Sequence, residues 1–216
     1  MAPRAAAASA VETITADLRT RILGGDLPAG APLGEVEVAE RYGVSRPTAK
    51  AAIENLVTVR LLVRNAHRTA RVAALSPDEV TDVYQTRELI ESEVVRRLAR
   101  DRLVPDDAVT ANAEIAALLD ASPMDIVEPD MRFHTALVDA LGSERTGLVY
   151  RLLVDEIRLC MTQVQDATLL SNESIAREHA ALLDHIAAGR GDDAADQVRA
   201  HLTRARHRLA AHLRSL

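Results

Sequence analysis

The sequence predicts a mostly α-helical protein in two parts, and three observations support this fold class. Apolar residues recur at helical spacing through most of the chain. A helix-start signature at residues 76–79 divides it, and no strand signal interrupts the helical pattern behind that point. We therefore expect short helices with a β-hairpin in front, and an all-α antiparallel bundle of six helices behind.

The boundary between the two parts lies in the stretch ALSPDE. Ser76 and Glu79 are spaced as a capping box, and Pro77 stands at the first helical position. Residues 11–75 are therefore expected to form one domain and residues 76–216 another.

The opening stretch MAPRAAAASA, residues 1–10, is expected to be a disordered tail, since it lacks the leucine-rich core of a secretory signal. No apolar run approaches the roughly 18 to 20 residues that span a bilayer. We therefore expect a cytoplasmic protein with no membrane partner.

The front part is predicted to be a winged helix-turn-helix. A helix in EVEVAERYG ends at Gly43, three residues turn, and a second helix begins with Ser45 as N-cap and Pro47 in its first turn. An earlier helix is expected in ETITADLRTRILGG, ahead of the Pro/Gly loop DLPAGAPLG. The alternating stretch LLVRNAHRTARVAAL predicts a β-hairpin. The alternative is an ordinary small helical hairpin.

The start of the second helix of this motif is polar and cationic. Arg46, Thr48 and Lys50 stand near its N-terminus, where a helix can enter the major groove of DNA and its dipole favours phosphate. The hairpin adds further basic side chains, Arg64, His67, Arg68 and Arg71. Residues 1–76 carry ten Arg/Lys against seven Asp/Glu, whereas the rest carries sixteen against twenty-five. A polyanionic partner is therefore expected for the front part alone.

Six helices are expected in the second part, and Gly142 and Gly189 are typical stops for two of them. Ser122, with Asp125, is a typical start. The predicted ranges are 77–101, 105–120, 123–141, 144–165, 172–188 and 192–214.

Four ligand-type residues interrupt the apolar stripes of these helices. Asp130 and His134 lie one helical turn apart on the third helix. His179 lies ten residues before Gly189 and His201 ten residues after Gly191, so the two are level in an antiparallel pair. Each histidine alone could be a neutral core imidazole bonded to a carbonyl. Together, the four groups predict a divalent transition-metal site, with zinc foremost and nickel, cobalt, iron or manganese as alternatives.

Arg87 stands within the apolar stripe of the first bundle helix. A buried guanidinium needs an anion, which could be a carboxylate of the protein itself. The other candidate is a small carboxylate effector, held bidentately beside the metal.

The motifs ILGG, PAG and GVSR, with Glu35 between the last two, stand in register within residues 11–74. Through them the front part resembles the winged-helix domain of the GntR superfamily of bacterial transcription regulators. The resemblance implies a double-stranded DNA operator as partner. The contacting residues that it implies are Ser45, Arg46, Thr48 and Lys50 on the recognition helix, and His67 and Arg68 on the wing.

The second part resembles the FCD ligand-binding domain of FadR-like GntR regulators, through RELIE at Arg87, DMRFH with LVDALG, EHAALLDHIAAGRGDDA and the later His201. Six helices fit the VanR-like arrangement. The resemblance implies a metal at Asp130, His134, His179 and His201, a small organic-acid effector, and a homodimer.

We therefore expect a ligand-responsive transcription regulator, a repressor that a small carboxylate releases from a palindromic operator, and no catalysis. Two alternatives remain open. One is a metal-dependent enzyme, for which Glu178 beside His179 could be the general base. The other is a bundle with a purely structural metal and no effector.

Overall fold

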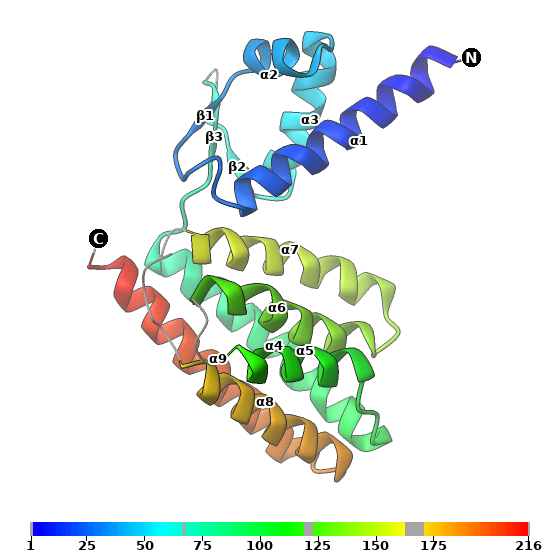
Figure 1. Cartoon of the computed structure of the whole chain (residues 1–216), viewed down its shortest axis with the longest axis vertical. Coiled ribbons are helices and arrows are strands. Elements are labelled where there is room, and N and C mark those ends of the chain that lie inside the picture. Colours follow the sequence, from blue (N-terminus) through cyan, green and yellow to red (C-terminus); the bar gives the residue numbers. More distant parts are fainter. Residues whose placement is uncertain (1, 67, 119–122, 163–170, 216) are drawn as a thin grey trace. The chain divides into compact units, whose positions relative to one another are not determined.

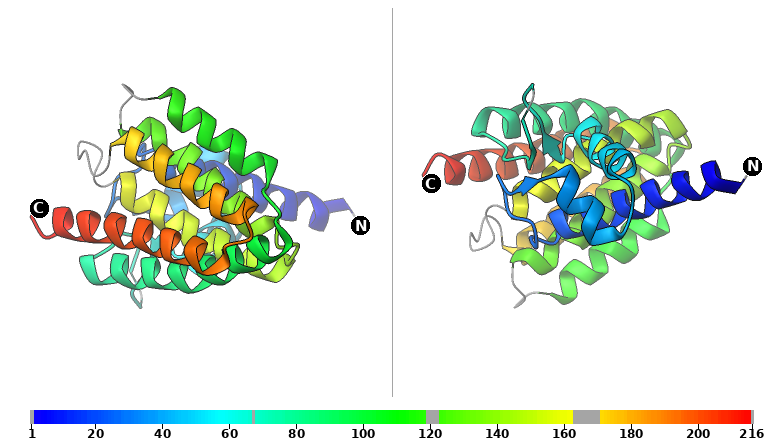
Figure 2. Two further views of the ribbon diagram at one scale, coloured as in Figure 1. Left: turned by 90° about the horizontal axis from the view of Figure 1, so that it is seen from below. Right: turned by 90° about the horizontal axis from the view of Figure 1, so that it is seen from above.

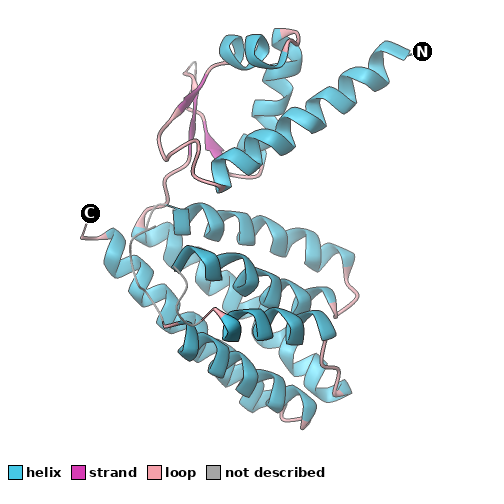
Figure 3. Cartoon of the chain, viewed as in Figure 1, coloured by secondary structure: helices cyan, strands magenta, loops and turns pink. Residues whose placement is uncertain are grey.

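The protein structure, a computed structural model, describes residues 2–66, 68–118, 123–162 and 171–215. The chain forms two compact units (Figure 1). One comprises Met1–Ala74 with Arg158–Gln163, and the other Leu75–Ile157 with Val164–Leu216. The described chain is mostly helical, and its short strands all belong to the first unit (Figure 3).

The first unit has the predicted winged helix-turn-helix. Its helices are α1 (Ala2–Leu23), α2 (Glu35–Tyr42) and α3 (Arg46–Thr58), and its strands are β1 (Pro32–Leu33), β2 (Leu62–Val63) and β3 (Ala70–Val72). Helix α3 packs against both α1 and α2. Buried apolar side chains at the contacts, among them Leu18, Ile22, Ile53 and Leu56, form the core.

Helix α1 differs from the expectation for the N-terminus. It begins at Ala2, so the stretch 1–10, expected to be a disordered tail, is helical from its second residue. Alanine has the highest intrinsic helix propensity, and this stretch is rich in it. This composition favours a helix even though the sequence of this stretch has no apolar stripe.

The wing is a three-stranded antiparallel sheet in the order β1-β3-β2. The hairpin of β2 and β3 confirms the prediction, with Leu62 opposite Val72. Strand β1 was missed, because it has two residues and lies in a stretch predicted to be a loop. Its Pro32 lacks an N–H group, which an edge strand tolerates.

The second unit is a bundle made of the six predicted helices. They are α4 (Pro77–Asp101), α5 (Asp106–Ala117), α6 (Pro123–Asp139), α7 (Glu144–Thr162), α8 (Asn172–Ala187) and α9 (Gly191–Leu213). Helices α4 and α9 lie side by side over much of their length (Figure 2). None of the described helices is both long enough and apolar enough to cross a bilayer.

The predicted helix boundaries of the bundle have clear local causes. The hydroxyl of Ser76 accepts a hydrogen bond from the Glu79 N–H at 3.3 Å, and the Glu79 carboxylate accepts one from the Ser76 N–H at 2.8 Å. This is the predicted capping box. Gly142 and Gly189 have φ of 70° and 75°, which glycine adopts without strain. The start predicted at Ser122 lies outside the described residues.

Candidate metal centre and DNA-binding surface

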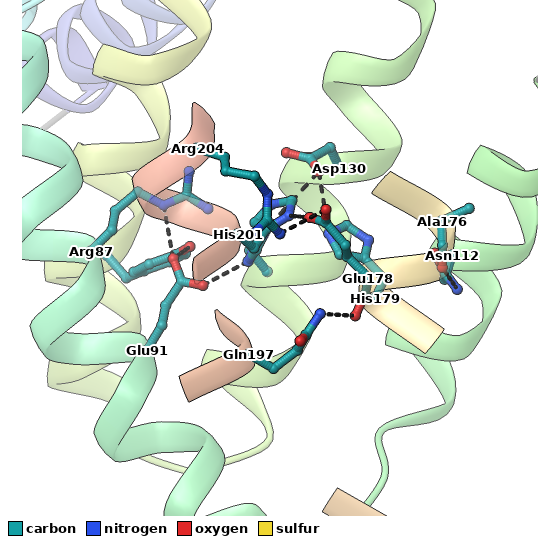
Figure 4. Close-up of polar contacts among 12 residues, drawn as sticks. Arg87, Glu91, Asn112, Asp130, Ala176, Glu178, His179, Gln197, His201 and Arg204 are labelled. Carbon is teal, nitrogen blue, oxygen red and sulfur yellow. Dashed lines mark hydrogen bonds and ion pairs between the residues drawn. The ribbon is translucent and has the colours of Figure 1, made fainter. Parts of the chain in front are cut away.

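Four side chains from three helices converge inside the bundle. Asp130 and His134 come from α6, His179 from α8 and His201 from α9. Figure 4 shows Asp130, His179 and His201 close together. One ligand atom from each lies within 4.8 Å of those of the other three. The three histidines are buried and Asp130 is partly buried. The structure therefore brings together the four residues that the sequence singles out.

The atoms at the centre of this cluster lack hydrogen-bond partners. Asp130 Oδ1 lies 3.5 Å from His179 Nε2 and 3.8 Å from His134 Nε2, too far for good hydrogen bonds. All three atoms are buried and have no partner among the described residues. Such orphaned polar groups cost about 1–3 kcal/mol each. A divalent cation at this point would satisfy all of them, so the donor set fits a metal.

Two further carboxylates orient the histidines. Glu91 Oε2 lies 2.6 Å from His134 Nδ1, and Glu178 Oε2 lies 2.8 Å from His201 Nδ1. In each case the carboxylate holds the proton on Nδ1 and leaves Nε2 with a free lone pair. This second layer is typical of histidines that bind metals. Glu91 is not among the site residues predicted from the sequence, and Glu178 is predicted only as a possible general base.

His179 is held by packing. Its ring stacks on Phe133 with centroids 3.7 Å apart and planes within 2°. Burial lowers the pKa of His179 well below its usual value, and the positive charge of Arg87 acts in the same direction. A neutral imidazole with a free lone pair is the form that binds a cation.

Arg87 has a protein carboxylate as its partner. Its Nε donates to Glu91 Oε1 at 2.8 Å, and both side chains are only 1% exposed. This is the alternative that the sequence left open for its anion. The pairing occupies only part of the guanidinium, because the buried Nη2 has no partner among the described residues. Arg87 therefore keeps an unused donor within the bundle.

Glu91 is the hub of this region. It accepts hydrogen bonds from Arg87 and, at 2.7 Å, from the hydroxyl of Tyr150 on α7, and it also binds His134. Burial alone would raise its pKa, but the positive charge of Arg87, together with the hydrogen bonds from His134 and Tyr150, outweighs burial and holds the pKa well below its usual range. An ionised carboxylate thus links α4, α6 and α7 next to the candidate metal centre.

The recognition helix α3 presents the residues predicted to contact DNA. Ser45 is its N-cap, and its hydroxyl accepts from the Thr48 N–H at 3.3 Å. The two hydroxyl groups of Ser45 and Thr48 are also bonded, at 2.8 Å. Arg46 and Lys50 are exposed. The first pair shapes the helix start, and the two cations are available at its surface.

The basic residues of the wing differ in their surroundings. Arg64 pairs with Glu35 at 3.3 Å and Glu54 at 2.7 Å, and Arg71 donates to the Gly30 carbonyl at 2.8 Å. Arg68 is exposed, whereas His67 lies outside the described residues. Arg64 and Arg71 therefore hold the wing in place.

Comparison with known families agrees with both halves of this arrangement. Residues 82–204 match the FCD domain, and residues 10–72 match the bacterial regulatory proteins of the gntR family. The chain therefore belongs to the gntR family of regulators that carry an FCD domain. It is a ligand-responsive, DNA-binding regulator of transcription, as the sequence predicts.

Relatives and solved structures of this class extend over most of the chain. The uncharacterized HTH-type transcriptional regulator BphR of Paraburkholderia xenovorans is 28% identical, over 93% of this chain and 85% of that protein. The HTH-type transcriptional repressor NanR of Enterobacter sp. (strain 638) is 25% identical, over 78% of this chain and 72% of that protein.

Two solved structures share the fold. A GntR transcriptional regulator from Rhodococcus sp. RHA1 superposes with a TM-score of 0.80 at 22% identity, covering 93% of this chain and 97% of that one. The Zn²⁺-bound FCD domain of TM0439 has a TM-score of 0.55 at 19% identity, covering 67% of this chain and all of that one.

Proposed function

We propose that this protein is a repressor that binds a palindromic operator as a homodimer, and that a small carboxylate effector releases it by binding at a metal-containing cavity of the bundle. In this proposal residues 11–75 bind DNA in the cytoplasm, and residues 76–216 bind the effector and dimerise. The observation that carries the sensing half is the cluster of unpaired ligand atoms on Asp130, His134 and His179.

Asp130, His134, His179 and His201 would hold the metal. Three imidazoles and one carboxylate suit zinc, which the Zn²⁺-bound FCD neighbour also supports. Nickel, cobalt, iron and manganese accept the same donors. When bound, such an ion supplies positive charge and open coordination positions for a carboxylate oxygen.

Arg87 would provide the second contact with the effector. Its unpaired Nη2 can donate to a carboxylate while Nε stays bonded to Glu91. Arg87 and Glu91 both belong to α4, whose capped start at Ser76 directly follows the DNA-binding residues. Effector binding at Arg87 would thereby act on the helix that continues from the DNA-binding part.

On the operator, Arg46 and Lys50 would reach base edges or phosphates, Ser45 and Thr48 would contact the backbone near the helix start, and Arg68 and His67 of the wing would lie along the DNA. The exposed cations of α3 support this assignment. A NanR relative that is named a repressor supports the direction of regulation.

The proposed homodimer is supported by exposed apolar side chains of α7, and its symmetry would match that of the proposed palindrome. Leu148, Val149 and Leu152 on α7 are between 42% and 56% exposed. A second copy of this chain that covered them would bury apolar surface, at about 25 cal/mol per Å².

The enzyme alternative is disfavoured by the surroundings of Glu178. Its two carboxylate oxygens are bound to His201 and, at 2.6 Å, to Arg204, so neither is free to act as a general base. The matching relatives are named as regulators. We therefore assign no catalytic residues.

The test combines metal analysis with operator binding. Purified protein is expected to contain about one equivalent of metal per chain, which His179→Ala removes and His212→Ala retains, since His212 is outside the cluster. Small organic acids are then screened for a rise in melting temperature, and each hit is added to an operator-binding titration. Unchanged operator affinity at a saturating, demonstrably bound acid would contradict the release mechanism.

A further inference from the structure

A cleft on the bundle is lined by residues of α4 and the end of α9. Its volume is about 370 Å³, in the range of small-ligand sites. The lining residues are Thr81, Gln85, Arg206, His207, Ala210 and Arg214. None of them is one of the four residues Asp130, His134, His179 and His201, which we call the metal-type cluster. We name this cavity the α4–α9 cleft.

Opposite charges pair along the rest of the α4–α9 contact. Arg96 of α4 binds Asp192 of α9 at 3.0 Å, and Glu88 of α4 binds Arg199 of α9 at 3.3 Å. The two helices therefore form successive cross-helix ion pairs as they run antiparallel. Such pairs balance the charge of α9 with side chains of α4.

These ion pairs between α4 and α9 do not continue into the cleft. There α9 presents Arg206, His207 and Arg214, whereas α4 presents the uncharged Thr81 and Gln85. Arg206 Nη2 lies 3.4 Å from His207 Nε2, a contact between two basic groups. Among the residues that the structure describes, no carboxylate pairs with Arg206 or Arg214.

Acidic residues near the cleft do not neutralise its excess of positive charge. Asp78 and Asp82 lie on the same turns of α4 but do not line the cleft. The C-terminal end of α9 carries a partial negative charge, which disfavours an anion, so the arginines must provide the attraction. Arg206 is half-buried, and a cation that is partly removed from water is more stable with a counter-charge.

We propose that the α4–α9 cleft binds a small oxyanion, the phosphate or carboxylate group of a metabolite, at a site separate from the metal-type cluster. The planar forks of Arg206 and Arg214 can each bind two oxygens, and the amide of Gln85 adds a neutral donor. The bound anion replaces the carboxylate that α4 lacks at this level. It thereby joins the first turns of α4 to the last turns of α9.

Binding is tested with inorganic phosphate and with acetate, each titrated at constant ionic strength against chloride. Both titrations use the full chain carrying His179→Ala, so that acetate cannot act through the metal-type cluster. We expect a saturable rise in melting temperature with at least one anion. The double variant Arg206→Gln/Arg214→Gln should weaken that response by about 10-fold or more in concentration.

The matched control is Arg100→Gln/Arg177→Gln, which removes the same charge from exposed arginines outside the cleft. Its melting temperature should rise with added anion as it does in the parent protein, the full chain carrying His179→Ala. A second variant, Gln85→Glu, supplies the missing carboxylate. It should raise the melting temperature without added anion and abolish the response. A phosphate response alone identifies a phosphorylated ligand, and an acetate response alone a carboxylate.

Two results would overturn the proposal. One is a parent protein with no saturable response to either anion. The other is an equal response in the cleft variants and in the control, which would show general ionic stabilisation. Neither readout involves the operator or the metal, so failure here is distinguishable from failure of the proposed function.

Discussion

The carboxylate of Glu91 on α4 lies 2.6 Å from Nδ1 of His134 on α6, although the two residues are 43 positions apart in the chain. This contact connects the candidate metal centre to the helix that carries Arg87. It gives the metal-type cluster a direct structural link to α4.

Replacing Glu91 should weaken metal binding without removing a ligand. Glu91→Gln leaves His134 in place but loses the charged acceptor on its Nδ1, so we expect metal affinity to fall by about 10- to 100-fold. A competition titration with a chromophoric chelator measures this. Glu93→Gln is the control, since Glu93 is exposed and pairs with Arg97 on its own helix. Equal affinity in both variants would argue against an orienting role for Glu91.

Replacing two arginines of the DNA-binding part should change DNA binding in different ways. Arg46→Ala on α3 is expected to abolish specific operator binding while circular dichroism shows unchanged helix content. Arg68→Ala on the wing should weaken binding to all sequences and lower the salt-dependence slope by about 1, as the loss of one phosphate contact does. Filter binding at several salt concentrations separates them. Retention of specific binding by Arg46→Ala would show that α3 is not the recognition helix.

Replacing Arg64 should lower the stability of the DNA-binding part, in addition to any effect on DNA binding. It bridges Glu35 and Glu54 and is only 19% exposed, so Arg64→Ala removes two ion pairs from the base of the wing. We expect a loss of about 1–2 kcal/mol in the free energy of unfolding of this part. Chemical denaturation measures it, with Arg68→Ala as the exposed counterpart. If both variants unfold alike, the bridge contributes nothing.

Cys160 should be inert in the native protein. Burial raises the pKa of its thiol to about 12, so the reactive thiolate is scarce at pH 8. A thiol-specific chromogenic reagent should therefore react slowly with native protein and rapidly once denaturant is added. Fast labelling under native conditions would mean that the α7 segment opens.

The periodicity of the sequence was sufficient to predict the six bundle helices and the convergence of Asp130, His134, His179 and His201. Helical spacing fixes which face a residue occupies, and the short α8–α9 connection at Gly189 sets the level of two histidines. Glu91 was not predicted, because its histidine partner, His134, is 43 positions away in the sequence. The Arg87–Glu91 spacing of four residues was the one signal that could have identified it.

Short and weakly patterned segments account for the remaining differences. Strand β1 owes its conformation to pairing with β3, where Leu33 is opposite Ala70, and this pairing is long-range. The helical start of α1 reflects alanine propensity, which a search for apolar stripes does not detect.

The stacking of Phe133 on His179 makes the chain convenient for spectroscopy. Phe133 is the sole phenylalanine in the sequence. Biosynthetic incorporation of a fluorinated phenylalanine therefore yields a single ¹⁹F resonance, and the ring that produces it lies against a histidine of the cluster. One NMR line can thus report on cation uptake by the intact protein, with no signal to assign.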